Sequence, residues 1–463
     1  MTSTATATPS VSGGFDPERP SFSLCLNYGL GTIAIAVLLN TVTTFFPALM
    51  TTVLGQSPAL AGLLLTLSKL YDIVVDLFVG NRIDRTNTRM RRRRRTMLAG
   101  AAIGSVSFFL LFSPPAFEGP WLVIALSAIL LLYSTGYSLF AVPYVAMAPD
   151  IARSYDGRTR LMTFRTFFSA VGQMIALAGA AALIGLGDGG AESYRIMGGV
   201  LAVVIFASQL SAWAGTSVVP EPVPHPPSPR IGFQATARQM LRNRPAVMLL
   251  CAKLLQYISL AANISTGLLF KLNVLQIGYE GQAQLSIAQN IAMGACTPLW
   301  LIAGKHFGKK NCYLAAIALY GLTMLSWLLA DNSITLFGLL SRGVLQGIGA
   351  GGMILMSLAM LPDVMQHDMR VNGVRRDGVY SSIYAVVEKT GFALGAAIIG
   401  VYLSFAGYQA TTGGQLVEQG AGAVRALYVG NAIAPFLLLA ASFAIMLFYP
   451  LGKAIIDTES AER

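Results

Sequence analysis

Charged residues are scarce in this chain. Of its 463 residues, 11% are charged, whereas 54% are hydrophobic and the mean hydropathy is +0.62. Soluble globular domains carry about 25% charged residues. The low charge content therefore excludes a water-soluble globule, and we expect most of the chain to lie within a lipid bilayer.

Residues that commonly do chemistry are also few. The sequence contains no HExxH or GxSxG motif. Its three histidines fall in predicted loops or at helix ends: His225, His306 and His367. The four cysteines lie in or at the ends of apolar segments without ligand spacing: Cys25, Cys251, Cys296 and Cys312. Small buried residues explain such cysteines best, so we expect no enzyme, no disulfide and no bound cofactor.

Apolar runs of membrane-spanning length, about 20 residues each, fill most of the sequence. Twelve of them are centred near Ile35, Leu70, Ser105, Ile129, Val171, Val203, Leu260, Ile291, Ile317, Gly349, Leu394 and Leu438. The sequence therefore predicts an all-α, polytopic membrane protein with twelve transmembrane helices. Residues 1–22 lack the basic and apolar parts of a signal peptide and are predicted to be a disordered tail, as are residues 453–463.

Basic residues mark one side of the predicted membrane. They concentrate in the even-numbered connections, such as residues 82–95 after the second helix and 370–376 after the tenth. The positive-inside rule places these connections and both termini in the cytoplasm, with the protein in the plasma (inner) membrane. The net charge of +11 is thus topological. The run Arg91–Arg95 indicates a solvated stop signal beside membrane lipids rather than a nucleic-acid site.

The chain divides in the middle. A proline-rich stretch opens residues 219–244, a predicted cytoplasmic loop, with six helices in residues 23–218 and six in residues 245–452. Paired six-helix halves are the architecture of alternating-access transporters.

The two halves also echo each other in their loops. Gly80, Asp84 and Arg85 spell GxxxDR after the second helix, and GKHFGKK occupies the matching loop after the eighth. We assign a cytoplasmic gate to Asp84 and Arg85 in the first half, and to Asp363 and Arg375 in the second.

Two carboxylates stand inside the second apolar run. Asp72 and Asp76 lie one helical turn apart and share a face with Lys69. Charges at this depth are costly and mark functional sites. Because one lysine cannot neutralise two carboxylates, we expect a Na⁺ or a proton to supply the missing charge. The alternative is a structural Lys69–Asp72 pair, with Asp76 bonded to a neighbouring helix.

Lys389 needs a counter-ion for the same reason. It lies among apolar residues beside Glu388, which would point about 100° away around a helix. Either Lys389 pairs with Asp72 or Asp76 when the cation is absent, or it forms a structural bridge with Glu388. The first arrangement would tie occupancy of the cation site to helix position.

Four segments of the sequence resemble the major facilitator superfamily, and within it the glycoside-pentoside-hexuronide:cation symporter family. They are NYGLG at residues 27–31, KLYDIVVDLFVGNRIDRT at 69–86, APDIARSYDGRTRLMTFRTFF at 148–168 and GVYSSIYAVVEKTG at 378–391. The similarity extends over nearly the whole chain. It implies the major facilitator fold and coupled transport of a small molecule with a cation.

The resemblance also implies roles for single residues. Asp72 and Asp76 would hold the coupling cation, as metal ligands if that ion is Na⁺, and Ser138 would add a hydroxyl oxygen. Lys389 matches the family's lysine on the eleventh helix. Val75 replaces an amide of the family pattern, which leaves both Na⁺ and H⁺ open as coupling ions.

The solute site departs from the family's sugar-binding pattern. Ala36 and Ala141 stand where sugar-transporting members have carboxylates. A site without those acceptors discriminates sugars poorly, so we expect a solute less polar than a simple sugar, such as an amphipathic or aromatic acid or a lysolipid. The candidate coupling and solute residues, besides Lys389, are Lys69, Arg165, Lys253, Tyr28, Tyr144, Tyr257 and Tyr384.

Other interpretations of these residues stay open. Each polar residue alone is equally typical of a helix-to-helix hydrogen bond, and Arg165 would also suit a gate bridge to Asp150 or Asp156. A glycoside:cation symporter and a non-transporting membrane sensor are the alternative functions. We expect a monomer whose partners are a small-molecule solute, the coupling cation and membrane lipids, and no nucleic acid.

Overall fold

The computed structural model describes residues 16, 18–84, 89–113, 117–152, 154–221, 243–372 and 377–451. This part of the chain is almost entirely helical and contains no strand beyond one isolated bridge between Leu54 and Thr412. Eleven of its helical segments are long and apolar enough to cross a membrane. The charged helix α2 (Pro58–Asp84), with 27 residues, completes the twelve. The expected all-α, twelve-helix architecture is confirmed.

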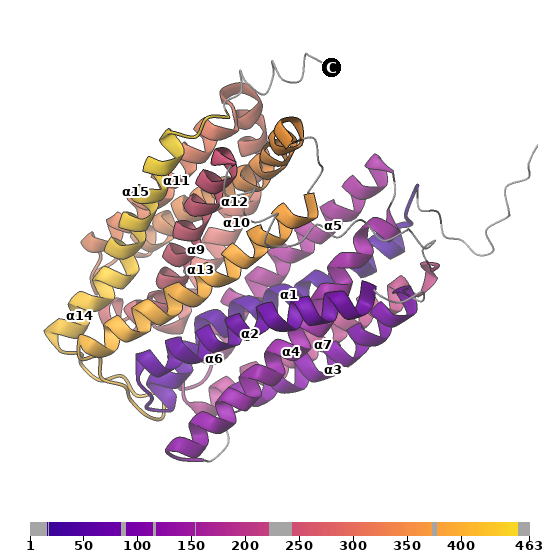
Figure 1. The fold of residues 1–463 in the computed structure, drawn as a ribbon. Coiled ribbons are helices and arrows are strands. Elements are labelled where there is room, and N and C mark those ends of the chain that lie inside the picture. The colour runs from indigo at the N-terminus through magenta and orange to yellow at the C-terminus, as the bar shows by residue number, and fades with distance from the viewer. Residues whose placement is uncertain are drawn as a thin grey trace, which may run out of the picture.

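Six spans form the first half, drawn in indigo to magenta in Figure 1. They are α1 (Phe22–Ala48), extended by the π-helical turn η1 (Leu49–Val53), then α2, α3 (Arg89–Phe112), α4 (Pro120–Ile151), α5 (Tyr155–Met174), continued through η2 (Ile175–Gly179) into α6 (Ala180–Gly185), and α7 (Ala191–Gly215) with η3 (Thr216–Val218).

Six further spans form the second half, which ends in yellow in Figure 1. They are α9 (Arg244–Phe270) with η4 (Lys271–Leu275), α10 (Gly278–Phe307), α11 (Lys309–Ser326) with η5 (Trp327–Leu329), α12 (Leu336–Asn372), α13 (Asp377–Phe405), and α14 (Ala421–Tyr428), continued through η6 (Val429–Ile433) into α15 (Ala434–Leu447). Every predicted helix centre falls within one of the twelve spans. Most of the predicted central loop and of both tails lies outside the described residues.

Local sequence explains where several helices begin. Ser21 caps α1, because its hydroxyl accepts a hydrogen bond from the N–H of Leu24 over 3.2 Å. Ser154 caps α5 in the same way, through the N–H of Gly157 at 3.0 Å. Gly308 separates α10 from α11 with a φ of +82°, a conformation that favours glycine.

Small residues let the helices around α13 approach closely. A Cβ atom at Gly395 would lie 2.6 Å from the carbonyl oxygen of Ile258 on α9. On the other side, a Cβ atom at Gly62 of α2 would lie 2.3 Å from the carbonyl oxygen of Ala396. Such contacts between backbones are typical of helix packing in membranes. They place α13, which carries Lys389, directly between α9 and α2.

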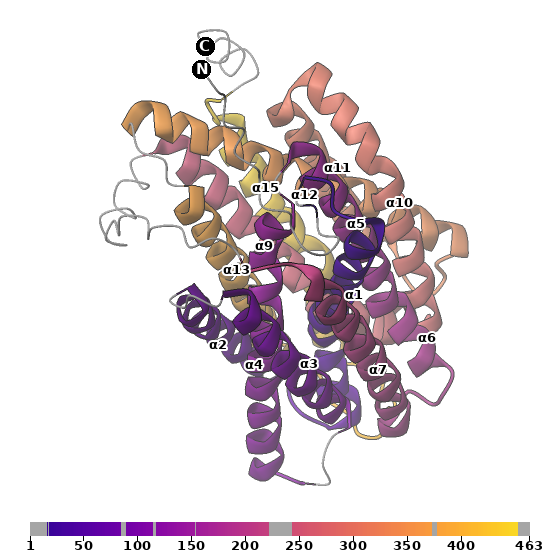
Figure 2. The same ribbon diagram turned by 90° about the vertical axis from the view of Figure 1, so that its right-hand side faces the viewer.

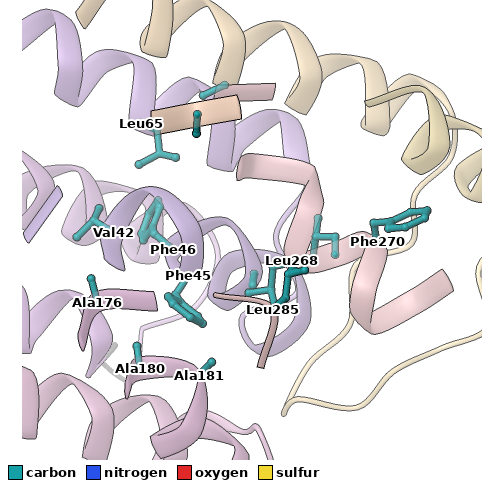
Figure 3. Close-up of a cluster of buried hydrophobic side chains, with 14 of the residues drawn as sticks. Val42, Phe45, Phe46, Leu65, Ala176, Ala180, Ala181, Leu268, Phe270 and Leu285 are labelled. Carbon is teal, nitrogen blue, oxygen red and sulfur yellow. The ribbon is translucent and has the colours of Figure 1, made fainter. Parts of the chain in front are cut away.

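Hydrogen bonds between the two halves gather at one end of the bundle. The N–H of Thr411 donates to the carbonyl of Thr51 over 2.7 Å, and the hydroxyls of Tyr194 and Tyr279 lie 2.9 Å apart. Buried apolar side chains from both halves pack beneath these contacts, including Phe45 in the first half, as Figure 3 shows. The halves are therefore closed against each other at the end formed by the odd-numbered connections.

Candidate functional site

The charged face of α2 begins with a buried ion pair. Lys69 and Asp72 are 7% and 1% exposed, and the Nζ atom of Lys69 lies 3.4 Å from Oδ2 of Asp72. Lys69 also faces the ring of Tyr137, at 5.9 Å from the ring centroid. The single nearby lysine thus neutralises the first carboxylate and leaves the second to find another partner.

Asp76 finds that partner in the other half of the molecule. Its Oδ2 atom forms an ion pair and hydrogen bond with Nζ of Lys389 on α13. The two side chains are about one quarter exposed, so the pair is less buried than Lys69–Asp72. Of the two arrangements open to Lys389, the structure shows the pairing with an α2 carboxylate.

Glu388 lies on a different face of α13 and makes a different contact. Its Oε2 atom accepts a hydrogen bond from the Tyr257 hydroxyl on α9 over 3.2 Å. The Nζ atom of Lys253, one turn before Tyr257, lies 4.6 Å from the centroid of the Tyr257 ring. Lys253 itself is buried and donates to Oε1 of Gln256 over 3.2 Å. Glu388 thus contacts Tyr257, and Lys253 lies against the same ring; both are predicted solute residues. The sequence did not indicate the contact with Glu388.

The predicted cation ligands each hold one oxygen without a hydrogen-bond partner among the described residues. These atoms are Oδ1 of Asp72, Oδ1 of Asp76 and Oγ of Ser138, all of them buried. The hydroxyls of Ser68 on α2 and Ser134 on α4 lie 2.7 Å apart. Because Asp72 and Ser138 each follow one helical turn later, they occupy matching levels of the two helices. Oxygens of this kind are what a hard cation binds.

Val75 borders the face of α2 that carries the two carboxylates. It lines a groove between α2 and α4 together with Tyr71 and Thr135. On a helix it points about 100° away from Asp76. The loss of the family's amide at this position leaves both Na⁺ and H⁺ open as coupling ions.

Tyr28 and Tyr144 form a contact between α1 and α4 rather than a free solute surface. Each hydroxyl donates to the other residue's backbone carbonyl, over 3.0 and 2.6 Å, and the rings stack at 4.4 Å. Both side chains are fully buried. In this conformation neither hydroxyl is available to a solute, because both are hydrogen-bonded within a packed core. The solute role of the two tyrosines stays a prediction.

Arg165 on α5 and Tyr384 on α13 each lie near another of the predicted solute residues. The guanidinium of Arg165 lies 6.0 Å from the Tyr144 ring centroid, while Asp150, one of its two suggested gate partners, pairs instead with Arg93 at 2.5 Å. The Tyr384 ring lies 6.0 Å from Nζ of Lys253.

The gate residues are only partly described. Arg85 and Arg375 lie outside the described residues, and so does the side chain of Asp84. Asp363 on α12 is bound by Lys309, whose Nζ lies 2.7 Å from both of its carboxylate oxygens. Lys309 belongs to the GKHFGKK segment. The sequence therefore indicates a basic residue in this loop, but not that its partner is Asp363.

Arg93–Asp150 and Lys309–Asp363 occupy equivalent places in the two halves. Each pair joins the start of the third span of its half to the later part of the fourth. The internal repeat thus extends from helix order to single charges.

Comparison with known proteins gives one family across the chain. The model of the family described as MFS/sugar transport protein matches residues 27–453. An uncharacterized symporter of Synechocystis sp. (strain ATCC 27184 / PCC 6803 / Kazusa) is 24% identical, over 96% of this chain and 97% of that protein. The glucuronide carrier protein homolog of Escherichia coli (strain K12) is 26% identical, over 94% of this chain and 93% of that protein.

A solved structure agrees in fold. The nucleoside transporter NupG aligns with a TM-score of 0.65 at 15% identity, covering 92% of this chain and all of that one. At this identity the likeness shows the arrangement of helices and nothing about solutes.

The Asp76–Lys389 pair predicts non-additive stability. Asp76→Asn and Lys389→Met should each lower the thermal unfolding midpoint, because each leaves one charge without its partner. The double variant should lose less than the sum, with a coupling of about 0.5 to 3 kcal/mol. Asp76→Asn combined with Lys253→Met is the matched control and should be additive. Additive loss in the Asp76–Lys389 double variant would show that the two side chains do not interact.

Proposed function

The chain belongs to the glycoside-pentoside-hexuronide:cation symporter family of the major facilitator superfamily, and from this premise we propose that it symports a cation with a small organic anion by alternating access. The coupling ion is Na⁺ or H⁺. The solute is less polar than a simple sugar and is an amphipathic or aromatic acid or a lysolipid.

One observation carries the proposal: the ion pair between Lys389 and Asp76 joins the two halves through the residue predicted to bind the coupling ion. A cation that binds Asp76 competes with Lys389. Binding of the ion therefore breaks a contact between the two halves. The site consequently has different affinities for the ion in different arrangements of the halves. Such differential affinity is what coupling requires.

The balance of intramembrane charge supports an anionic solute. Three acidic and three basic side chains gather around α2, α9 and α13: Lys69, Asp72, Asp76, Lys253, Glu388 and Lys389. The formal charges of these six cancel, and Arg165 on α5 adds one positive charge nearby, so the region favours an anion even before a cation binds. A coupling cation adds one positive charge to this low-dielectric region, and an anion restores the balance, so each favours binding of the other. Lys253 and Arg165 are the residues proposed to meet the anionic group.

The apolar character of α1 supports a solute with few hydroxyls. Between Gly31 and Leu39 the one polar side chain is Thr32. Its hydroxyl donates to the carbonyl of Gly29 over 2.7 Å and contacts the Tyr144 hydroxyl at 3.1 Å. A sugar placed here would leave hydroxyls unpaired, at roughly 1 to 3 kcal/mol each. An apolar ring would instead gain about 25 cal/mol per Å² of buried surface.

The choice of ion rests on the three oxygens without partners. Na⁺ would bind Asp72, Asp76 and Ser138, with the rest of its shell from water or carbonyls. A proton would act at Asp76 alone, because neutralising that carboxylate releases Lys389. Asp72 then tunes the choice of ion, while Asp76 is indispensable in either case.

A glycoside:cation symporter is the second candidate. The relative named as a glucuronide carrier homolog favours it. A glucuronide unites a sugar with a carboxylate, so the two candidates share the anionic group and differ in the need for a sugar.

The gate roles complete the proposed cycle. Asp84 and Arg85 in the first half, and Asp363 and Arg375 in the second, would close the end opposite Thr51 and Thr411 when the outer contacts open. We place that gate and both termini in the cytoplasm, as the basic loops predict. An ion pair that meets water contributes about 0 to 1 kcal/mol, which would suit a latch that must open.

Coupling is tested by transport in proteoliposomes, with a labelled acid first identified by thermal shift. Asp76→Asn should abolish uphill accumulation but keep exchange, and Asp72→Asn should weaken dependence on Na⁺ first. Glu192→Gln, which alters an exposed pair with Arg195, is the control and should transport normally. Full accumulation by the Asp72→Asn/Asp76→Asn variant would contradict the cation site. If the unaltered protein moves no solute at all, the sensor alternative replaces transport.

The solute class is tested by binding of matched probes, measured as thermal shifts with and without Na⁺. 2-Naphthoate should stabilise the protein at concentrations where methyl β-galactoside has no effect. Lys253→Met and Arg165→Gln should each weaken naphthoate binding about tenfold, the loss of one charge-assisted hydrogen bond. Stabilisation by 4-nitrophenyl glucuronide together with none by naphthoate would contradict the proposal that the solute contains no sugar. It would favour the glycoside:cation symporter.

A further inference from the structure

The five consecutive arginines at the start of α3 are not equivalent in the structure. Arg93 is buried and pairs with Asp150, and Arg94 lies over the Trp213 ring at 5.0 Å and bonds to its carbonyl. Two of the five are thus held by the protein. The other three, Arg91, Arg92 and Arg95, have no carboxylate partner among the described side chains.

These three arginines line one pocket. It has a volume of about 530 Å³, and Thr96, Ala99 and Leu139 form the rest of its wall. Positions 91, 92 and 95 fall on one side of a helix, so their guanidinium groups converge on the same space. The positive end of the α3 dipole adds to their field, and Glu221 offsets it by accepting hydrogen bonds from the N–H groups of residues 90 and 91 at 2.8 Å.

An apolar groove continues from this pocket along the membrane-spanning part of the bundle. The groove has a volume of about 540 Å³ and runs between α2, α3 and α4. Arg92, Thr96 and Leu139 line both spaces, so the two are continuous. Val75 and Phe78 of α2 supply apolar wall deeper in the groove, and Phe78 is 63% exposed.

The position of the combined site agrees with the membrane boundary. The membrane-spanning helix α3 opens with these arginines and becomes apolar from Met97 onward, so the arginines stand at the level where lipid headgroups lie. Arg82 of α2 lines the same end of the groove. A cationic head space followed by an apolar channel of similar volume is the shape of an amphiphile with an anionic headgroup.

We propose that this pocket and groove bind one anionic phospholipid of the inner leaflet, with its phosphate held by Arg91, Arg92 and Arg95 and one acyl chain lying between α2 and α4. The occupant is a resident lipid and not the transported solute. Most of the α2 wall, including Tyr71, Val74 and Phe78, lies on a different face from Asp72 and Asp76, and Val79 borders the carboxylate face. The site therefore stands apart from the proposed transport cycle, and its test does not require transport.

The test measures lipid binding to delipidated protein in detergent. Phosphatidylglycerol is titrated, bound lipid is counted by native mass spectrometry, and phosphatidylcholine and inorganic phosphate serve as the other probes. We expect one tightly held phosphatidylglycerol, weaker phosphatidylcholine, and no competition by inorganic phosphate. Displacement of the lipid by inorganic phosphate would overturn the lipid assignment and indicate a site for a free anion.

Variants separate the two parts of the site. Arg91→Gln/Arg92→Gln/Arg95→Gln should weaken phosphatidylglycerol at least tenfold, since each interfacial arginine contributes about fivefold. Arg19→Gln/Arg244→Gln/Lys305→Gln removes the same charge elsewhere and should change affinity less than twofold. Val75→Trp fills the groove without changing charge and should weaken the lipid at least fivefold.

Three results with the variants would also overturn the proposal. They are unchanged affinity in the arginine triple variant, equal losses in the two triple variants, and unchanged affinity in Val75→Trp, which would reduce the binding to surface charge alone. Thermal unfolding of each apo variant shows whether it is folded, so a loss of binding is assigned to the site only where the midpoint matches that of the parent protein.

Discussion

Neutralising charge inside a bilayer is the constraint on which this structure depends. A charged side chain at the centre of a membrane is costly, and it is tolerated where a partner or a cavity receives it. Here Asp72 has its partner on the same helix, whereas the partner of Asp76 lies in the opposite half. Because of the Asp76–Lys389 pair, the neutralisation of charge depends on the relative positions of the two halves. The proposed coupling follows from that fact.

Packing supports the same contact. Gly62 and Gly395 let α2 and α9 approach α13 closely, so Lys389 is carried on a helix of the second half that packs directly against α2 of the first. The joined end of the bundle adds backbone hydrogen bonds and an apolar cluster with residues from both sides (Figure 3). Figure 2 shows the same helices from a second direction, with α13 beside α2 and α9. A movement that opens this end must also shift the environment of Lys389.

The fold was predictable from the sequence because its signals are long and redundant. Each span presents about 20 apolar residues, and each even-numbered connection contains several basic residues. Asp72, Asp76 and Lys389 also stood out, because a charge within an apolar run needs a partner. The contact between Tyr28 and Tyr144 could not be predicted, because the sequence of a helix does not show whether a tyrosine hydroxyl meets a solute or a backbone carbonyl.

Other contacts join residues that are far apart in the sequence, and no local pattern indicates which residues pair. Lys309 reaches Asp363 across 54 residues, and Arg93 reaches Asp150 across 57. The arginine run shows the same limit. The composition of the run indicates an interfacial stop signal. The packing of α2, α4 and Trp213 determines that two of its side chains are held by the protein and that three line a pocket.

The central claim is that Lys389 and the coupling cation exchange at Asp76. Cation affinity of Lys389→Met tests it most directly, by titrating the unfolding midpoint with Na⁺ at pH 8 and with pH in the absence of Na⁺. Removing the internal competitor should raise affinity for the coupling ion at least tenfold, while Lys253→Met should leave it within twofold. Unchanged affinity for both Na⁺ and H⁺ in Lys389→Met would contradict the exchange.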